Sequence, residues 1–109
     1  MAQNNLASLY PYPARSGSSP VACQAITVST SAIAGTAYDT NSVGVVELQG
    51  QGVAIRYRGD GTDPTSTVGG YIPANTILTW SVARFNATKF IRDTAAGADG
   101  TLFVTPFQI

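Results

Sequence analysis

Beyond residue 20 the chain alternates apolar and polar residues in short segments, and no stretch of ten residues shows helical spacing. A period of two places successive side chains on opposite faces of a strand, so each segment predicts a strand with one buried face. In residues 53–58, Val53, Ile55 and Tyr57 point one way, while two arginines point the other. Short strands of this kind must bury their apolar faces against one another, which predicts an all-β protein.

Six segments carry this pattern and are separated by turn-forming residues. They are residues 23–29, 43–49, 53–58, 76–82, 89–92 and 101–107. The glycines of Gly50-Gln51-Gly52 permit the positive φ of a tight loop, which predicts a hairpin between the strands on either side. Pro106 lacks an amide donor, so the last strand is expected to lie at an edge or to end there. The one helix candidate is a single turn at 83–88. These elements predict a single β-sandwich or a jelly-roll-like barrel.

The length of 109 residues fits one domain, which we place at residues 21–109. Residues 1–20 differ in composition, because three prolines and a run of serines and glycine prevent regular strand or helix formation there. We interpret them as an extended N-terminal arm that lies on a neighbouring subunit or across the domain's own sheet; a disordered tail is the alternative. The predicted protein-interaction residues of the arm are Leu6, Leu9, Tyr10 and Tyr12.

Charged residues make up only 11% of the chain, whereas an ordinary soluble domain has about 25%. Neutral polar residues replace them, and such a surface favours broad contact with other proteins, although secreted β-domains share this composition. Six basic and six acidic residues cancel, so we expect no binding to nucleic acid or to a membrane surface. The N-terminal sequence lacks the features of a secretory signal, and no apolar stretch approaches the ~18 residues of a membrane span. We expect synthesis in a cytoplasm.

The residues that carry most enzyme chemistry are scarce. The chain has no histidine, which is the commonest general base and metal ligand. Its single cysteine, Cys23, cannot form an intramolecular disulfide and is predicted to be a small buried hydrophobe in the first strand. The carboxylates are scattered, with only Asp60 and Asp63 close in sequence. We therefore expect no catalytic site, no cofactor and no resident metal ion.

Two loop motifs have both a functional and a structural interpretation. The sequence from Asp60 to Thr65 offers closely spaced oxygen ligands for calcium, but it lacks the distal glutamate of a calcium-binding loop, and its residues fit a turn. Arg58-Gly59-Asp60 spells a tripeptide that integrins recognise, although three residues often match by chance. We predict a structural turn in this loop.

Trp80 and the aromatic residues that follow it also allow two interpretations. They could form a platform that stacks on carbohydrate, or they could fill the core at alternate positions, which we favour because aromatics supply much of the core area of a small domain. They are Trp80, Phe85, Phe90, Phe103 and Phe107.

The sequence AIRYRGDGTDPT, followed by a Val-Gly pair, FIR, an Asp-Gly turn and TLFVTPF, resembles small virion proteins of tailed bacteriophages. Residues 26–38, ITVSTSAIAGTAY, resemble the opening strand of these proteins, so that the similarity spans residues 26–107. The IRY-DGT-PT pattern is also similar to a carbohydrate-associated module of bacterial chitobiase-type proteins. The shared positions are turn and core positions, and they transfer no functional residues.

The resemblance implies a non-enzymatic component of the virion, made in the bacterial host cytoplasm. The first expectation is a capsid decoration (cement) protein whose partner is the major capsid protein or another virion protein. The alternatives are a neck, tail or fibre-attachment component and a carbohydrate-binding host-recognition module. Because the core is small, association would stabilise it, and we expect a homo-oligomer, with a trimer as the first expectation and a dimer as the second.

Overall fold

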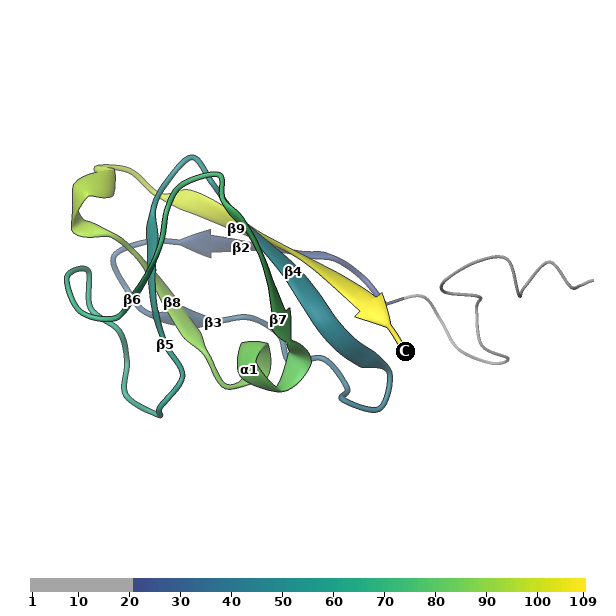
Figure 1. The fold of residues 1–109 in the computed structure, drawn as a ribbon. Helices are drawn as coiled ribbons and strands as arrows, with labels where there is room; N and C mark the ends of the chain where they lie inside the picture. Colours follow the sequence, from purple (N-terminus) through teal and green to yellow (C-terminus); the bar gives the residue numbers. More distant parts are fainter. Residues whose placement is uncertain (1–20) are drawn as a thin grey trace, which may run out of the picture.

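Two four-stranded antiparallel sheets pack face to face in the computed structural model, which describes residues 21–109 (Figure 1). The larger sheet has the order β2 (Gln24–Val28), β9 (Gly100–Gln108), β4 (Val43–Gln51) and β7 (Ile77–Ser81). The smaller sheet has the order β3 (Ile33–Ala34), β8 (Lys89–Arg92), β5 (Ile55–Arg58) and β6 (Gly70–Ile72). The predicted β-sandwich is confirmed. The predicted arm, with Leu6, Leu9, Tyr10 and Tyr12, lies outside the described residues.

The strands pair in a nested order along the chain. β5 pairs with β6, β4 with β7, β3 with β8 and β2 with β9, and every pair is antiparallel. The chain from β2 to β9 therefore follows the path of one long hairpin, which is wound so that its successive pairs fall alternately in the two sheets. The additional pairings of β4 with β9 and of β5 with β8 join these pairs into sheets.

The predicted hairpin at Gly50-Gln51-Gly52 is wrong, because β4 and β5 belong to different sheets. β4 continues to Gln51, and both of its sides are occupied by β7 and β9. The chain then crosses to the smaller sheet through Gly52, whose φ of 87° is one that glycine adopts without strain. The glycines between the two alternating segments thus correctly predicted a turn of the chain at this point. They did not predict that pairing with strands distant in sequence places β4 and β5 in different sheets.

The remaining differences from the prediction concern short or local features. β3 and β6 have only two and three residues, too few to show a periodic pattern. β9 continues past Pro106 to Gln108. Its first half lies between β2 and β4, but β2 pairs with it only as far as Val104. The single helical turn is present as α1 (Val82–Asn86), and its N-cap is Ser81, whose hydroxyl accepts a hydrogen bond from the amide of Arg84.

The core lies between the sheets and follows the alternation seen in the sequence. Trp80, Phe85 and Phe90 are buried in it, as predicted. Phe103 is not, because its place in β9 turns it to the outer face of the larger sheet, where it is 37% exposed. The prediction for Cys23 is also wrong: it precedes β2 by one residue and is exposed.

The register of β5 gives a direct test of the core. Ile55 has no exposed surface, so Ile55→Asp both removes apolar packing, which alone costs about 2–5 kcal/mol, and buries an unpaired charge. We expect this variant to remain unfolded by circular dichroism. Thr27→Asp is the matched control, since Thr27 is exposed on β2, and it should fold like the parent. Equal folding of both variants would contradict the register.

Candidate interaction surface

The outer face of the larger sheet is a continuous surface formed by every second residue of its four strands. Ala25 lies opposite Phe103, Phe103 opposite Gln49, and Gln49 opposite Ile77, so that one row of side chains crosses the whole sheet. A parallel row brings Val45 next to Phe107. Ile77, Val45 and Phe103 are 57%, 40% and 37% exposed, which leaves apolar side chains open to solvent across the sheet.

This surface carries almost no charge, and we call it the neutral face. Glu47 is the only charged residue in the four strands of the larger sheet, and it lies between Thr79 and Thr105. The other outward-facing residues are apolar or are Thr, Ser, Gln or Ala. A surface of exposed apolar and neutral polar side chains costs less free energy to desolvate against another protein than a charged surface does.

The smaller sheet has the opposite character. Its strands carry four basic residues, and the loop formed by residues 59–69 lies against its outer face. Lys89 of β8 contacts Asp63 of this loop at 2.9 Å, and the amide of Thr94 donates to the carbonyl of Ser66. Ile91 shares the outer face with Arg56 by register and is nevertheless buried. The charged and loop-covered side of the sandwich is therefore the one opposite the neutral face.

The ion pair between Arg56 and Asp93 links β5 to the chain that follows β8 on this side of the sandwich. The Arg56 Nε donates to Asp93 Oδ1 at 2.6 Å, and one of its terminal nitrogens donates to the carbonyl of Gly69. The other carboxylate oxygen of Asp93 accepts from the amide of Ala95 and caps η2 (Thr94–Ala96). The hydrogen bond from Ala95, followed by the one from Arg56, lowers the pKa of Asp93, because both stabilise the charged form.

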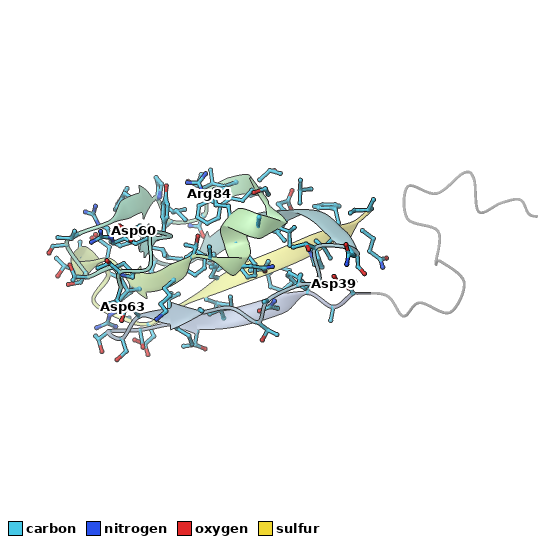
Figure 2. All side chains as sticks on the ribbon, turned by 90° about the horizontal axis from the view of Figure 1, so that it is seen from below. Asp39, Asp60, Asp63 and Arg84 are labelled. Carbon is cyan, nitrogen blue, oxygen red and sulfur yellow. The ribbon has the colours of Figure 1, made fainter. Side chains whose placement is uncertain are left out.

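The charged residues of the two loop motifs are paired within the chain. Arg58 and Asp60 form an ion pair with each other, and Asp60 also accepts from the amide of Thr62. The hydrogen bond from Arg58 is the main cause that lowers the pKa of Asp60. Figure 2 shows Asp60 and Asp63 near one end of the sandwich and Asp39 towards the other. Within residues 21–109 no three His, Cys, Asp or Glu residues come together as a metal site.

Arg84 is the one basic residue in the described part of the chain that has no carboxylate within ion-pair distance. Its guanidinium lies 4.1 Å from the centre of the Trp80 ring and donates a hydrogen bond to the hydroxyl of Tyr57. Stacking on aromatic rings stabilises a cation in this position. Trp80 is therefore buried beneath Arg84, and its ring face is not open to a sugar.

The neutral face was not predicted from the sequence. The predicted site residues, Leu6, Leu9, Tyr10 and Tyr12, fall outside the described residues. The signal was present in the alternation of the strands, but it could be used only after each strand was assigned to a sheet. Without that assignment, the sequence shows only that the chain as a whole has few charged residues. It does not show that β2, β4, β7 and β9 together carry only one of them.

No family model matches the chain, and comparisons with curated proteins and with solved structures find no match either. None of the helices within residues 21–109 is long and apolar enough to cross a membrane.

The ion pair of Asp93 predicts how stability depends on pH. Its folded-state pKa lies below the value of about 3.9 for an unfolded aspartate, so it stabilises the fold above that pH. This contribution is lost as the pH falls through the lowered pKa. We expect Asp93→Asn to lower the melting temperature at pH 7 and to flatten its decline between about pH 5 and pH 2, measured by circular dichroism.

Asp99→Asn is the matched control at pH 7, because Asp99 also pairs with an arginine but its side chain is 55% exposed. It should lower the melting temperature less than Asp93→Asn. Equal losses, or an unchanged acid decline in Asp93→Asn, would show that the Arg56–Asp93 pair does not fasten this side of the sandwich.

Proposed function

We propose that the protein is a non-enzymatic structural component of a tailed-phage particle, a capsid decoration (cement) protein that binds and stabilises subunits of the shell. The observation that carries this proposal is the neutral face, a sheet surface with exposed Val45, Ile77 and Phe103 and a single charge at Glu47. Large contacts with another protein are favoured where apolar groups are exposed and few charges need to be desolvated.

The strand order supports the same proposal. Nested antiparallel pairs wound into two four-stranded sheets correspond to the eight strands and two Greek keys of a double-sheet jelly roll, an architecture found in viral capsid proteins. The same architecture also occurs in lectins and enzymes, so the order alone does not select a function. Combined with the resemblance of residues 26–107 to small virion proteins, it favours a component of the shell.

The pairing of charges supports a passive role. Four of the five basic residues in residues 21–109 form ion pairs within the chain, and Arg84 lies on aromatic rings. These charges stabilise the sandwich and its loop. Attachment through the neutral face would then depend mainly on apolar contact and hydrogen bonds, and it would depend weakly on salt concentration.

Binding to particles that lack the protein tests this proposal. Ile77→Lys replaces the most exposed apolar side chain of the neutral face with a charge, and we expect it to weaken co-sedimentation with such particles at least tenfold. Folding should not change, since Ile77 is 57% exposed. Val68→Lys is the matched control: Val68 is 52% exposed in the loop of residues 59–69, and this variant should bind like the parent.

Equal binding of both variants would contradict a role for the neutral face. Copy number then separates the positions in the particle, because a shell offers on the order of hundreds of sites and a neck or tail about a dozen or fewer. Failure to bind particles at all, together with binding in a glycan screen, would favour the carbohydrate-recognition alternative.

A further inference from the structure

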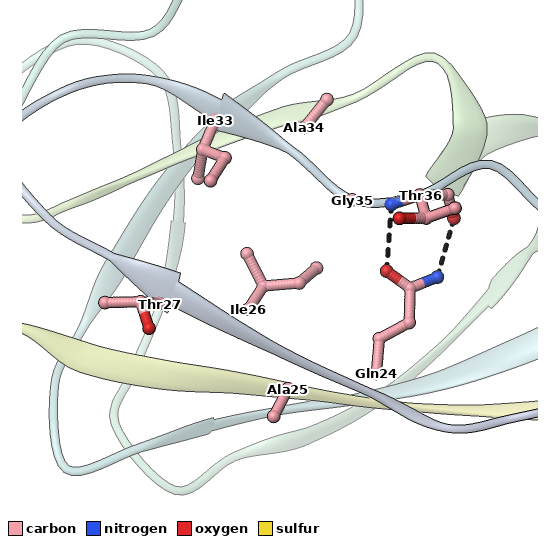
Figure 3. A pocket seen from close by; sticks show the side chains of 8 residues that line it. All are labelled: Gln24, Ala25, Ile26, Thr27, Ile33, Ala34, Gly35 and Thr36. Atoms are coloured by element: carbon pink, nitrogen blue, oxygen red, sulfur yellow. Dashed lines mark hydrogen bonds between the residues drawn. The ribbon is translucent and has the colours of Figure 1, made fainter.

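A cleft opens along one side of the sandwich, between the edge strand of each sheet (Figure 3). β2 forms one wall and β3 with the residues after it forms the other, and the cleft, of about 490 Å³, is shallow and wide open to solvent. Ile26 and Ile33 face it from the two walls (Figure 3). None of its lining residues is charged, so it is suited to an apolar and neutral occupant.

At one end of the cleft, a side chain of β2 is hydrogen-bonded to the backbone of the opposite wall. The side-chain amide of Gln24 donates to the carbonyl of Thr36 at 2.6 Å and accepts from the Thr36 amide at 2.8 Å (Figure 3). These are the two hydrogen bonds that a neighbouring strand would make with one residue of an edge. Thr36 thus presents its donor and acceptor toward the cleft, and a side chain of β2 takes the place of a peptide group.

Within residues 21–109 the edge of β2 away from β9 has no strand partner, and its sequence lacks the usual protective residues. Edge strands are normally protected by lysine, proline, a bulge or a covering loop, whereas β2 reads QAITV and contains neither charge nor proline. An extended segment could therefore add to β2 by backbone hydrogen bonds and place alternate side chains in the cleft.

Residues 6–13 of the chain, LASLYPYP, have the pattern that such a segment requires. In an extended chain, residues of one parity direct their amides to the same side. Pro11 and Pro13 have no amide hydrogen and are two residues apart. In an extended segment, the missing donors would therefore both lie on one side, and the amides of Tyr10 and Tyr12 would point to the other side. Such a strand can pair along one edge only, and it ends the sheet.

We propose that the cleft between β2 and β3 binds residues 6–13 of a second copy of the chain. The segment contains no charge, as the cleft lining does, and it offers Leu6, Tyr10 and Tyr12 on one face. Each copy carries one cleft and one segment, so exchange around a ring satisfies every site and closes a dimer or a trimer. The proposal does not depend on the proposed function, since it concerns only how copies join.

The start of the described chain lies where the segment can reach a second copy. Val21 packs against the core, and the carbonyl of Ala22 accepts a hydrogen bond from the Tyr38 hydroxyl at 2.8 Å. These contacts fix residues 21 and 22 outside the cleft, beyond the end at which Gln24 is hydrogen-bonded to Thr36. In Figure 1 the chain reaches β2 from the end of the sandwich where β9 finishes. From there residues 14–20 span up to about 23 Å when extended, enough to reach an adjacent molecule.

Disulfide trapping in the full-length protein distinguishes the two arrangements. In a Cys23→Ser background, Ser8→Cys is placed in the segment of one protein and Ile33→Cys in the cleft of another. Ser8 shares the parity of Tyr10, and Ile33 lines the cleft at 39% exposure. We expect oxidation of the mixture to give a disulfide between the two proteins. Thr79→Cys, on the neutral face, replaces Ile33→Cys in the control and should trap at least tenfold less.

A chain that carries both Ser8→Cys and Ile33→Cys gives the decisive outcome. We expect closed covalent oligomers on a non-reducing gel, whose size reports two or three copies. Monomers with an internal disulfide would show that the segment occupies its own cleft and would overturn the proposal. So would equal trapping by Thr79→Cys, or no trapping in any combination.

Discussion

The pairing of β4 with β9 holds the larger sheet together. These two nine-residue strands run side by side from Val43 opposite Gln108 to Gln51 opposite Thr101, and β9 is also the strand on which β2 pairs. Leu48 and Val104 face each other across this pairing with no exposed surface. Because the two strands are distant in sequence, the larger sheet depends on long-range contacts.

The arrangement of charge follows from the way the sheets are connected. The connection between β5 and β6 is long enough to fold back over the smaller sheet. There Arg56 donates a hydrogen bond to the carbonyl of Gly69, and Lys89 pairs with the carboxylate of Asp63. Within residues 21–109, no connection between the strands of the larger sheet covers its outer face in the way that the loop of residues 59–69 covers the smaller sheet. The charged residues in the strands therefore lie mostly in the smaller sheet, and Glu47 is the one in the larger sheet.

Local pattern was sufficient to predict the fold class, the six longer strands and most of the core. Val53, Ile55 and Trp80 are buried where alternation placed them. The hairpin at Gly50–Gly52 was wrong because partner choice depends on contacts between residues distant in sequence, which a local pattern does not contain. The same reason applies to Phe103: alternation within β9 defines two faces, but only the position of the strand in the sheet decides which face is covered.

Oxidative footprinting of the protein, free and bound to particles, tests the central claim most directly. Phe103 on the neutral face and Tyr71 on the outer face of the smaller sheet are both exposed aromatic rings, and they report on opposite sides of the same molecule. We expect binding to protect Phe103 several-fold and to leave Tyr71 unchanged. Protection of Tyr71 with an unchanged Phe103 would show that the charged side faces the partner, and it would contradict the account.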